Sequence, residues 1–434
     1  MSQAMSNSIL SRFPQLRGEN ISFAPGSGGL GRVVMGAGVI AIAACGLIGY
    51  FGPADVHAKQ ALAAYHIGVM AVMAMCLGAL FLMLVFHLTQ AGWPSPFRRQ
   101  IENIAGFLPI VYAMVWPTII AEIMVGGRLF QWLTDAKDGN YLLNHKSFWF
   151  FGGGEVGHGS IPFPTFFLVR AVLYGLIWTY LVTRLTSLSR EQDTATDATP
   201  FRHARFTSAW GMLLFALSTA FAAFDWLMSL DYKFFSTMWG VYYFAGAAFS
   251  GSALTVLILA VLRGKGKLEG VVTHEHFHDL GKLMFSFTVF WAYIAFSQYF
   301  LIWYSNIPEE TAFFLYRSNY WAWLGILLML GHFIVPFLII IFRGVKRNPR
   351  LLGAMAVWAI FIHIMDIYWI VRPMVYSQMP DPPHGPLVGL TDVLGITGVV
   401  AIFAGYLIVR IPSRELVGVG DPYLVEGLEH KNYV

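Results

Sequence analysis

Long apolar stretches alternate with short polar segments along almost the whole chain. An α-helix needs roughly 20 predominantly apolar residues to cross a hydrocarbon core of about 30 Å. Ten stretches meet this requirement, at residues 31–51, 61–88, 103–125, 163–188, 206–230, 234–262, 281–304, 312–342, 350–371 and 388–410. The pattern predicts an all-α polytopic membrane protein, with a transmembrane domain over 31–410, an N-terminal segment 1–30 and a C-terminal tail 411–434.

The Lys and Arg residues fall unevenly on the two sides of this predicted arrangement. An even number of spans places both termini on one side, and 20 of the 28 basic residues fall there, against seven on the other side and Arg170 within a span. Cytoplasmic loops of membrane proteins carry an excess of Lys and Arg. We therefore expect both termini in the cytoplasm.

Composition supports a membrane location and excludes several other classes of protein. Hydrophobic residues make up 57% of the chain and charged residues 12%, far from the balance of a soluble domain. The net charge of +4 lies in short loops and does not indicate nucleic-acid binding. Cys45 and Cys76 both lie in apolar runs, which leaves no disulfide framework and no cysteine pattern for zinc or iron–sulfur clusters. We expect no metal and no covalently bound cofactor.

Three polar segments stand out between the spans. Residues 126–162 form the longest outer loop and are predicted to be a docking or lid element. The loop contains the glycine-rich FGGGEVGHGS, whose glycines indicate turns. A nucleotide site is not indicated, because the phosphate-binding GK[ST] ending is missing. Residues 189–204 are predicted to be a flexible cytoplasmic linker that divides the bundle into halves. THEHFHDL at 273–280 suggests a metal site, but histidines at alternate positions diverge on a helix, which favours helix capping and subunit contact.

Ionisable residues inside the predicted spans are the candidates for chemistry, because a charged group at mid-helix costs at least about 2.5 kcal/mol. The carboxylates concentrate in the outer half of the membrane, whereas two of the three histidines lie nearer the middle. The candidates for a proton path are Glu122, Arg170, Asp225, Asp231, Asp366, Asp392, His66, His332 and His363.

His363 and Asp366 form the tightest predicted group, because their spacing places both on one helical face. A carboxylate beside an imidazole is suited to proton transfer, and also to accepting the protons of a quinol. Two alternatives remain open. Single intramembrane residues often form helix-to-helix hydrogen bonds of about 0.6 kcal/mol without any chemistry. His332 and His363 also match in depth, as the two axial ligands of a haem would.

Two motifs resemble a known family. FDWLMSLDYKFFSTMWGVYYFAG at 224–246 and FWAYIAFSQYFLIWYSNIPEET at 290–311 resemble the ActF family of membrane subunits of bacterial alternative complex III, which is related to the NrfD-like or polysulfide-reductase-like proteins. The resemblance spans nearly the whole chain. It implies ten helices in two four-helix bundles with two peripheral helices, and it includes Asp225 and Asp231 as members of the FDWLMSLD motif.

The resemblance also implies a role in a quinol:cytochrome c oxidoreductase of the bacterial cytoplasmic (inner) membrane. The implied partners are a homologous NrfD-like C subunit, an iron–sulfur subunit, c-type haem subunits and small membrane subunits. This chain would then carry no redox cofactor, would conduct protons, and would offer a second pocket for a quinol such as menaquinol. The competing hypotheses are a structural membrane anchor for extrinsic redox subunits and a secondary transporter.

Overall fold

Every regular element of the described chain is helical. The computed structural model describes residues 11–24, 26–52, 55–157, 159, 161–377 and 388–432. Helices account for 79% of the structure, and no strand occurs among these residues. Ten helical segments are long and apolar enough to cross a membrane, as the sequence predicts: Gly29–Phe51, Val56–Leu88, Ser95–Val125, Thr165–Thr194, Thr199–Asp231, Trp239–Gly264, His274–Ser305, Ala322–Ile340, Pro349–Ser377 and Leu390–Arg410.

Several of these segments are single helices and two are interrupted. The uninterrupted spans are α2 (Gly29–Phe51), α3 (Asp55–Leu88), α9 (Thr165–Thr194), α10 (Thr199–Trp226), α11 (Trp239–Gly264), α12 (His274–Ser305), α17 (Pro349–Ser377) and α18 (Leu390–Arg410). The third span consists of α4 (Arg98–Ala105), α5 (Leu108–Ala113) and α6 (Trp116–Val125). The eighth consists of α14 (Ala322–Leu328), the π-helical segment η5 (Met329–Ile334) and α15 (Val335–Ile340).

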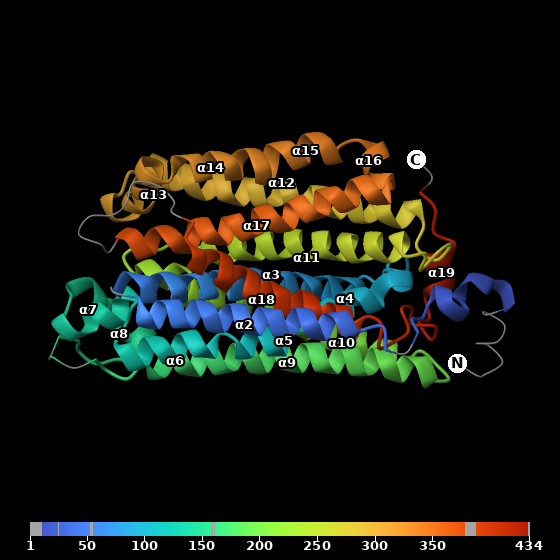
Figure 1. Ribbon diagram of the computed structural model, residues 1–434, viewed down its shortest axis with the longest axis horizontal. Coiled ribbons are helices and arrows are strands. Elements are labelled where there is room, and N and C mark those ends of the chain that lie inside the picture. Colours follow the sequence, from blue (N-terminus) through green and yellow to red (C-terminus); the bar gives the residue numbers. More distant parts are fainter. Residues whose placement is uncertain are drawn as a thin grey trace.

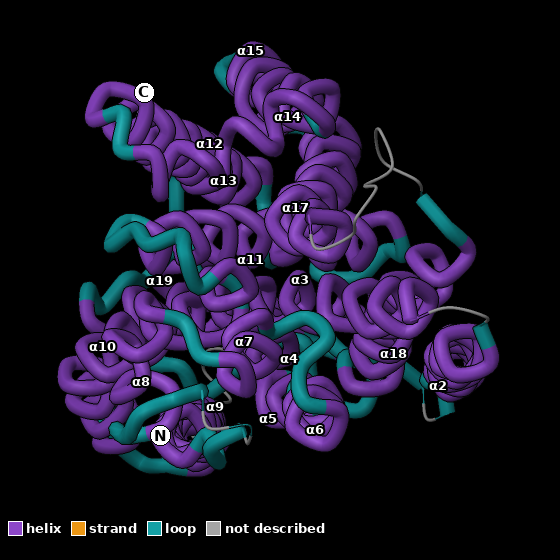
Figure 2. Tube along the Cα trace, turned by 90° about the vertical axis from the view of Figure 1, so that its left-hand side faces the viewer, coloured by secondary structure: helices purple, strands orange, loops and turns teal. Residues whose placement is uncertain are grey.

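The helices pack as two groups of four with a peripheral pair. One group contains α3, the α4–α6 span, α9 and α10, and the other contains α11, α12, the α14–α15 span and α17. Helices α2 and α18 pack along each other at the edge and both contact α3 (Figure 2). The division between the two groups of four therefore falls between α10 and α11, and the predicted division at residues 189–204 is wrong.

Helices α3 and α11 join the two groups at a close crossing. A Cβ added to Gly251 of α11 would lie 2.7 Å from the backbone carbonyl carbon of Gly78 of α3. Only glycine on both sides allows the two backbones to approach so closely, the packing that small residues give to membrane helices. This crossing fixes how the two groups of four face each other.

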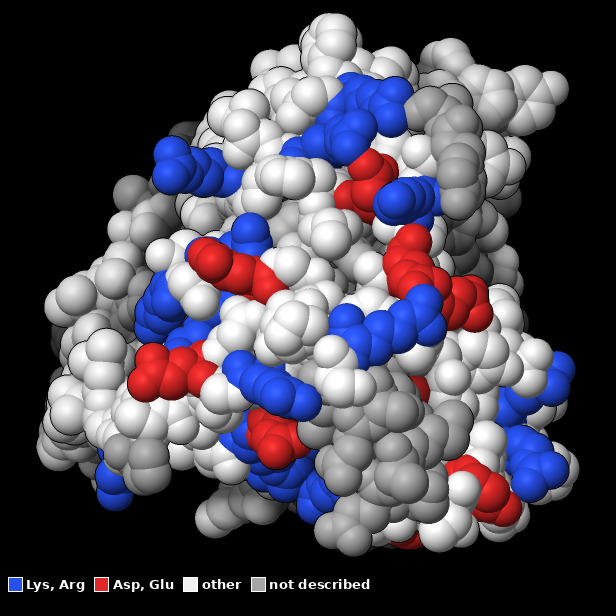
Figure 3. Space-filling view, turned by 90° about the vertical axis from the view of Figure 1, so that its right-hand side faces the viewer, with Lys and Arg blue, Asp and Glu red and all other residues white. Residues whose placement is uncertain are grey.

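Both described ends of the chain lie at the same end of the bundle (Figure 1). We call this the terminal end; α2 begins there, α18 ends there and α19 (Leu424–Leu428) packs across it. Lys and Arg side chains are spread over this face with carboxylates among them (Figure 3). The opposite end, which we call the far end, carries α7 (Gln131–Asp138), α8 (Tyr141–Phe151) and α13 (Pro308–Tyr320).

Two segments differ from their predicted form, and a third agrees with it. The expected linker 189–204 is mostly helical, since α9 ends at Thr194 and α10 begins at Thr199, where Asp197 accepts hydrogen bonds from the Thr199 backbone and hydroxyl at 3.1 and 2.7 Å. The expected span 312–342 divides into α13 and the α14–α15 span. The described glycines of FGGGEVGHGS all have positive φ, which confirms turns; His158 and Ser160 of that motif lie outside the described residues.

Candidate functional site

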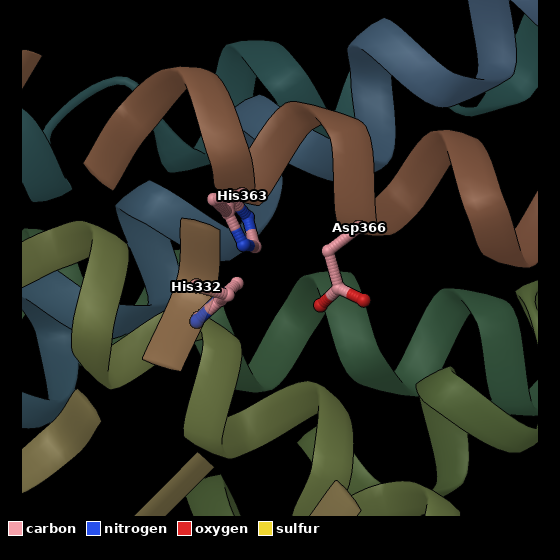
Figure 4. A group of neighbouring side chains, drawn as sticks. All are labelled: His332, His363 and Asp366. Carbon is pink, nitrogen blue, oxygen red and sulfur yellow. The ribbon is translucent and has the colours of Figure 1, made fainter. Parts of the chain in front are cut away.

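His332, His363 and Asp366 meet in the interior of the second group of helices (Figure 4). His363 and Asp366 lie on one face of α17, as their spacing predicts, and His332 comes from η5. One nitrogen of each histidine and one oxygen of the carboxylate lie within 4.8 Å of one another. All three side chains are buried, with at most 1% of each residue exposed. We refer to this group as the triad.

The carboxylate of Asp366 is held by two neutral donors. The Tyr242 hydroxyl of α11 donates to Oδ1, and the Trp291 indole of α12 donates to Oδ2 at 3.1 Å. No Lys or Arg among the described residues forms an ion pair with Asp366. No fixed counter-ion therefore stabilises the charged form of this carboxylate. Its proton affinity is set by burial and by hydrogen bonds from neutral groups.

The two imidazoles have no well-formed hydrogen bond among the described residues, although the Ala71 backbone interacts with His363. Neither ring nitrogen of His332 or of His363 is paired among the described residues. His332 stacks on the Trp291 indole with ring centroids 3.6 Å apart and lies 4.5 Å from Phe249. Buried polar atoms are nearly always satisfied by protein or by ordered water. Unpaired imidazole nitrogens beside a carboxylate are therefore positions at which water or an exchanging proton fits.

Backbone geometry explains how His332 reaches this position. Within η5 the Val335 N–H bonds to the Leu330 carbonyl, in the i to i−5 pattern of a π-helix. Pro336 has no N–H to continue that pattern. The Gly331 carbonyl instead accepts a hydrogen bond from the Trp358 indole of α17 at 2.7 Å. The wider turn is therefore tied to α17, the helix that carries the other two triad residues.

The triad also depends on a small residue on α11. A Cβ added to Gly246 would lie 3.2 Å from Cε1 and 3.3 Å from Nδ1 of His363. Glycine here leaves the space beside the imidazole that a larger residue would fill. The three possible ligand atoms of the triad all lie within 4.8 Å of one another, so the same side chains could also hold a metal ion.

Asp225 and Arg170 form a second buried group, at the far end of the first group of helices. The Arg170 guanidinium donates to both carboxylate oxygens of Asp225, at 2.8 and 2.7 Å. Tyr174 and Trp149 donate to the same carboxylate at 2.7 and 3.0 Å. This carboxylate has a charged partner and is fully satisfied, so its arrangement is that of a structural joint between α8, α9 and α10.

The other predicted carboxylates are also bound by local partners. Glu122 accepts hydrogen bonds from the backbone N–H groups of residues 128–130, at 2.8 to 3.0 Å, and so closes the turn after α6. Asp392 pairs with Arg372 of α17 at 2.7 Å and accepts from the Gly389 N–H at the start of α18. Asp231 is partly exposed and accepts from the Lys233 N–H at 3.2 Å. These positions are separate from the triad.

His66, His274 and His276, which lie outside the triad, bond to backbone groups of neighbouring elements. His66 bonds through Nε2 to the Trp226 carbonyl at 2.8 Å, and so ties α3 to the end of α10. In the segment 273–280, Thr273 caps α12, His274 bonds to the Arg347 carbonyl and His276 bonds to the Gly427 carbonyl. His274 and His276 thus bond to different partners, as expected for a helix start, whereas Nδ1 of His278 has no partner among the described residues.

Sequence reasoning missed two kinds of residue at these sites. Tyr242 and Trp291 bind the triad, but one tyrosine or tryptophan among so many has no distinguishing pattern. Glu102 of α4 is buried at the terminal end, where Ser189 donates to it at 2.6 Å and Arg99 lies 4.0 Å away. Sequence reasoning missed it because it lies just before the predicted third span.

A small cavity lined by Glu102, His87 and Asp193 has a volume of about 20 Å³, enough for one water.

Two basic residues counted with the outer loops are buried in the structure. Arg372 is the partner of Asp392. Arg317 of α13 donates to the carbonyls of Trp369 and Ile370 at 3.2 and 2.8 Å. Pro373, inside α17, leaves the Trp369 carbonyl without its helical donor, and the guanidinium replaces that donor.

Comparisons with known proteins give no further assignment. Neither the family models nor the curated proteins that were searched match this chain.

Proposed function

We propose that this chain is a non-haem membrane subunit of a bacterial quinol:cytochrome c oxidoreductase of the alternative complex III type, and that its triad transfers protons within the cytoplasmic membrane. The observation that carries the proposal is the meeting of two unpaired imidazoles with a carboxylate held only by neutral donors. The assignment to the complex rests on the motifs at 224–246 and 290–311.

Each member of the triad has a distinct part in the proposed transfer. Asp366 alternates between carboxylate and acid, with Tyr242 and Trp291 holding its oxygens in place. His363, on the same face of α17, exchanges its proton with Asp366 through the unpaired ring nitrogens or one water. His332 passes the proton onward, because its ring is fixed by stacking and its nitrogens remain available.

The redox steps belong to partner subunits in this proposal. A homologous C subunit oxidises the quinol, and iron–sulfur and c-type haem subunits accept its electrons. This chain supplies a route for protons through the interior of the membrane, with both termini in the cytoplasm.

The test is to purify the native assembly and to measure quinol-driven cytochrome c reduction and coupled proton movement. Asp366→Asn keeps the size of the side chain and removes the exchangeable proton, so we expect proton movement to fall by at least about tenfold with the assembly intact. Asp231→Asn makes the same change at a partly exposed position and should alter proton movement less than about twofold.

A second variant separates chemistry from assembly. His332→Phe keeps an aromatic ring against Trp291 and removes both ring nitrogens. If neither this variant nor Asp366→Asn changes turnover or proton movement in an intact assembly, the chain is a structural anchor and the proposal is wrong.

The interrupted spans favour one other function, a secondary transporter. Such proteins place broken helices around a site near the middle of the membrane, and here turns divide the third span into α4, α5 and α6, while a π-helical turn at His332 widens the eighth. Isolation in mild detergent decides between the two functions. Haem and iron–sulfur absorption in the native assembly supports the respiratory subunit, whereas a chain isolated without them supports the transporter.

A further inference from the structure

A cavity of about 460 Å³ lies at the far end, away from the triad. It is open to the surface and is lined by α8, the last turns of α10 and the segment 228–237 that leads to α11. The volume falls in the range of about 300 to 1,000 Å³ typical of small-molecule sites. The cavity has no part in the proposed proton transfer.

Aromatic side chains form most of the wall. Phe221 and Phe224 come from α10, Phe148 comes from α8, and Phe234 and Phe235 come from the segment before α11. Phe148 and Phe235 are 63% and 52% exposed, so the cavity opens between aromatic rings at the surface of the molecule. Aromatic residues of membrane proteins gather at the boundary between hydrocarbon and headgroups. An opening of this kind admits an apolar chain from the bilayer.

Lys146 gives the cavity a cationic edge. It is the one charged side chain of the lining among the described residues, and its ammonium lies 5.3 Å from the Phe235 ring centroid. Nζ donates to the Tyr232 carbonyl at 2.5 Å, which uses one of its three N–H donors. Burial lowers the pKa of Lys146, and nearby Asp231 acts in the opposite direction. A bound anion would favour the charged ammonium.

We infer that this cavity binds one anionic phospholipid, with an acyl chain between the aromatic walls and the phosphate on Lys146. The lining also contains the polar side chains of His145, Ser229, Ser236 and Thr237, which are suited to headgroup oxygens. Lysines near membrane interfaces lay their stems along apolar surface and keep the ammonium among polar groups, an arrangement that suits Lys146 beside Phe235 and the Tyr232 carbonyl. The cavity thus joins an apolar wall to one positive charge. An anionic lipid complements both, because its acyl chain is apolar and its phosphate is negative.

Lipid binding has a structural consequence through Trp149. This residue lines the cavity and its indole donates to Asp225 at 3.0 Å. A lipid in the cavity therefore packs against the side chain that completes the Asp225–Arg170 joint. A ligand that binds only the folded state stabilises it.

The test is a native mass spectrometry titration of the purified full chain with phosphatidylglycerol and with phosphatidylcholine of the same acyl chains. We expect one tightly retained phosphatidylglycerol and weaker phosphatidylcholine. Lys146→Gln should weaken phosphatidylglycerol binding by about fivefold, the effect of one lysine on anionic lipid. Lys233→Gln removes an exposed charge at the same end outside the lining and should change it less than about twofold.

A thermal unfolding series keeps the inference testable if Lys146→Gln does not fold. Phosphatidylglycerol should raise the unfolding temperature of the unmodified chain, and Lys146→Arg should keep that shift. Equal binding of the two lipids would overturn the inference. Equal loss of phosphatidylglycerol binding in Lys146→Gln and Lys233→Gln would also overturn it. A third contrary result would be that the ligand that co-purifies in the cavity is displaced by a short-chain naphthoquinone but not by phosphatidylglycerol. The natural ligand would then be a planar ring.

Discussion

At the scale of single residues, the buried carboxylates differ in the charge of their partners. Asp225 faces a guanidinium that donates to both of its oxygens, whereas Asp366 faces a phenol and an indole. The neighbouring guanidinium favours the charged form of the first carboxylate. The second has no such neighbour, so gaining or losing a proton there disturbs no ion pair.

Loss of the Arg170 charge should be costly. Arg170→Met leaves Asp225 buried without its cation, and breaking one partner of a buried ion pair typically costs about 3 to 5 kcal/mol. We expect the variant to unfold at lower denaturant concentration in detergent. The double variant Arg170→Met/Asp225→Leu should recover part of the loss. Equal stability of the single variant and the unmodified chain would show that the joint contributes little.

Sequence spacing predicted the part of the triad that lies within one helix. His363 and Asp366 share a face of α17 because of their spacing, and the structure confirms this. His332 was a candidate, but its place beside them depends on the π-helical turn and on how α14–α15 packs against α17. Glu122, Asp225 and Asp392 were identified as unusual positions, but their partners depend on helix rotation, which apolar periodicity does not determine.

At the scale of elements, the interruption at η5 shows how backbone composition positions a side chain. The sequence predicted one continuous helix over 312–342, because apolar residues extend almost without a break. Pro336 and the wider turn at η5 change the direction in which His332 points relative to a regular helix. Apolar length predicts that a span exists, and local backbone chemistry decides how it is divided.

The Trp358 indole should be needed to keep this turn in place. Trp358→Phe leaves the Gly331 carbonyl without its donor, and an unpaired buried polar group costs about 1 to 3 kcal/mol. We expect lower stability in denaturant unfolding and slower coupled proton movement in the native assembly. The matched control is Trp323→Phe, an exposed tryptophan on α14, in the span that contains the π-helical turn. Wild-type behaviour of Trp358→Phe would show that the π-helical turn does not depend on this hydrogen bond.

At the scale of the whole molecule, ten apolar spans and their even number were predicted correctly from hydropathy alone. The grouping into two fours and a peripheral pair agrees with the arrangement that the family resemblance implies. The sequence did not reveal the Gly78–Gly251 crossing that joins the two groups, because small residues occur in most of the spans. The orientation of the terminal end in the membrane stays a prediction.

Cysteine labelling tests that orientation. Ser413→Cys places an exposed thiol at the terminal end and Lys137→Cys places one at the far end. Cys45 and Cys76 are buried, so the introduced thiols should dominate labelling. An impermeant maleimide added outside intact cells should label Lys137→Cys and spare Ser413→Cys until the membrane is broken. The reverse pattern would place both termini outside the cytoplasm.

The stacking of Trp291 on His332 makes this tryptophan an intrinsic fluorescence reporter of the triad. One indole donates its N–H to Asp366 and presents its ring face to His332, so it contacts both a proton acceptor and a neighbouring base. When His332 gains a proton, the pair changes from two neutral rings to a cation against an aromatic face, which the indole stabilises. The emission of this tryptophan should therefore change with the protonation of the triad, as the part of the emission of the 14 tryptophans that Trp291→Phe removes.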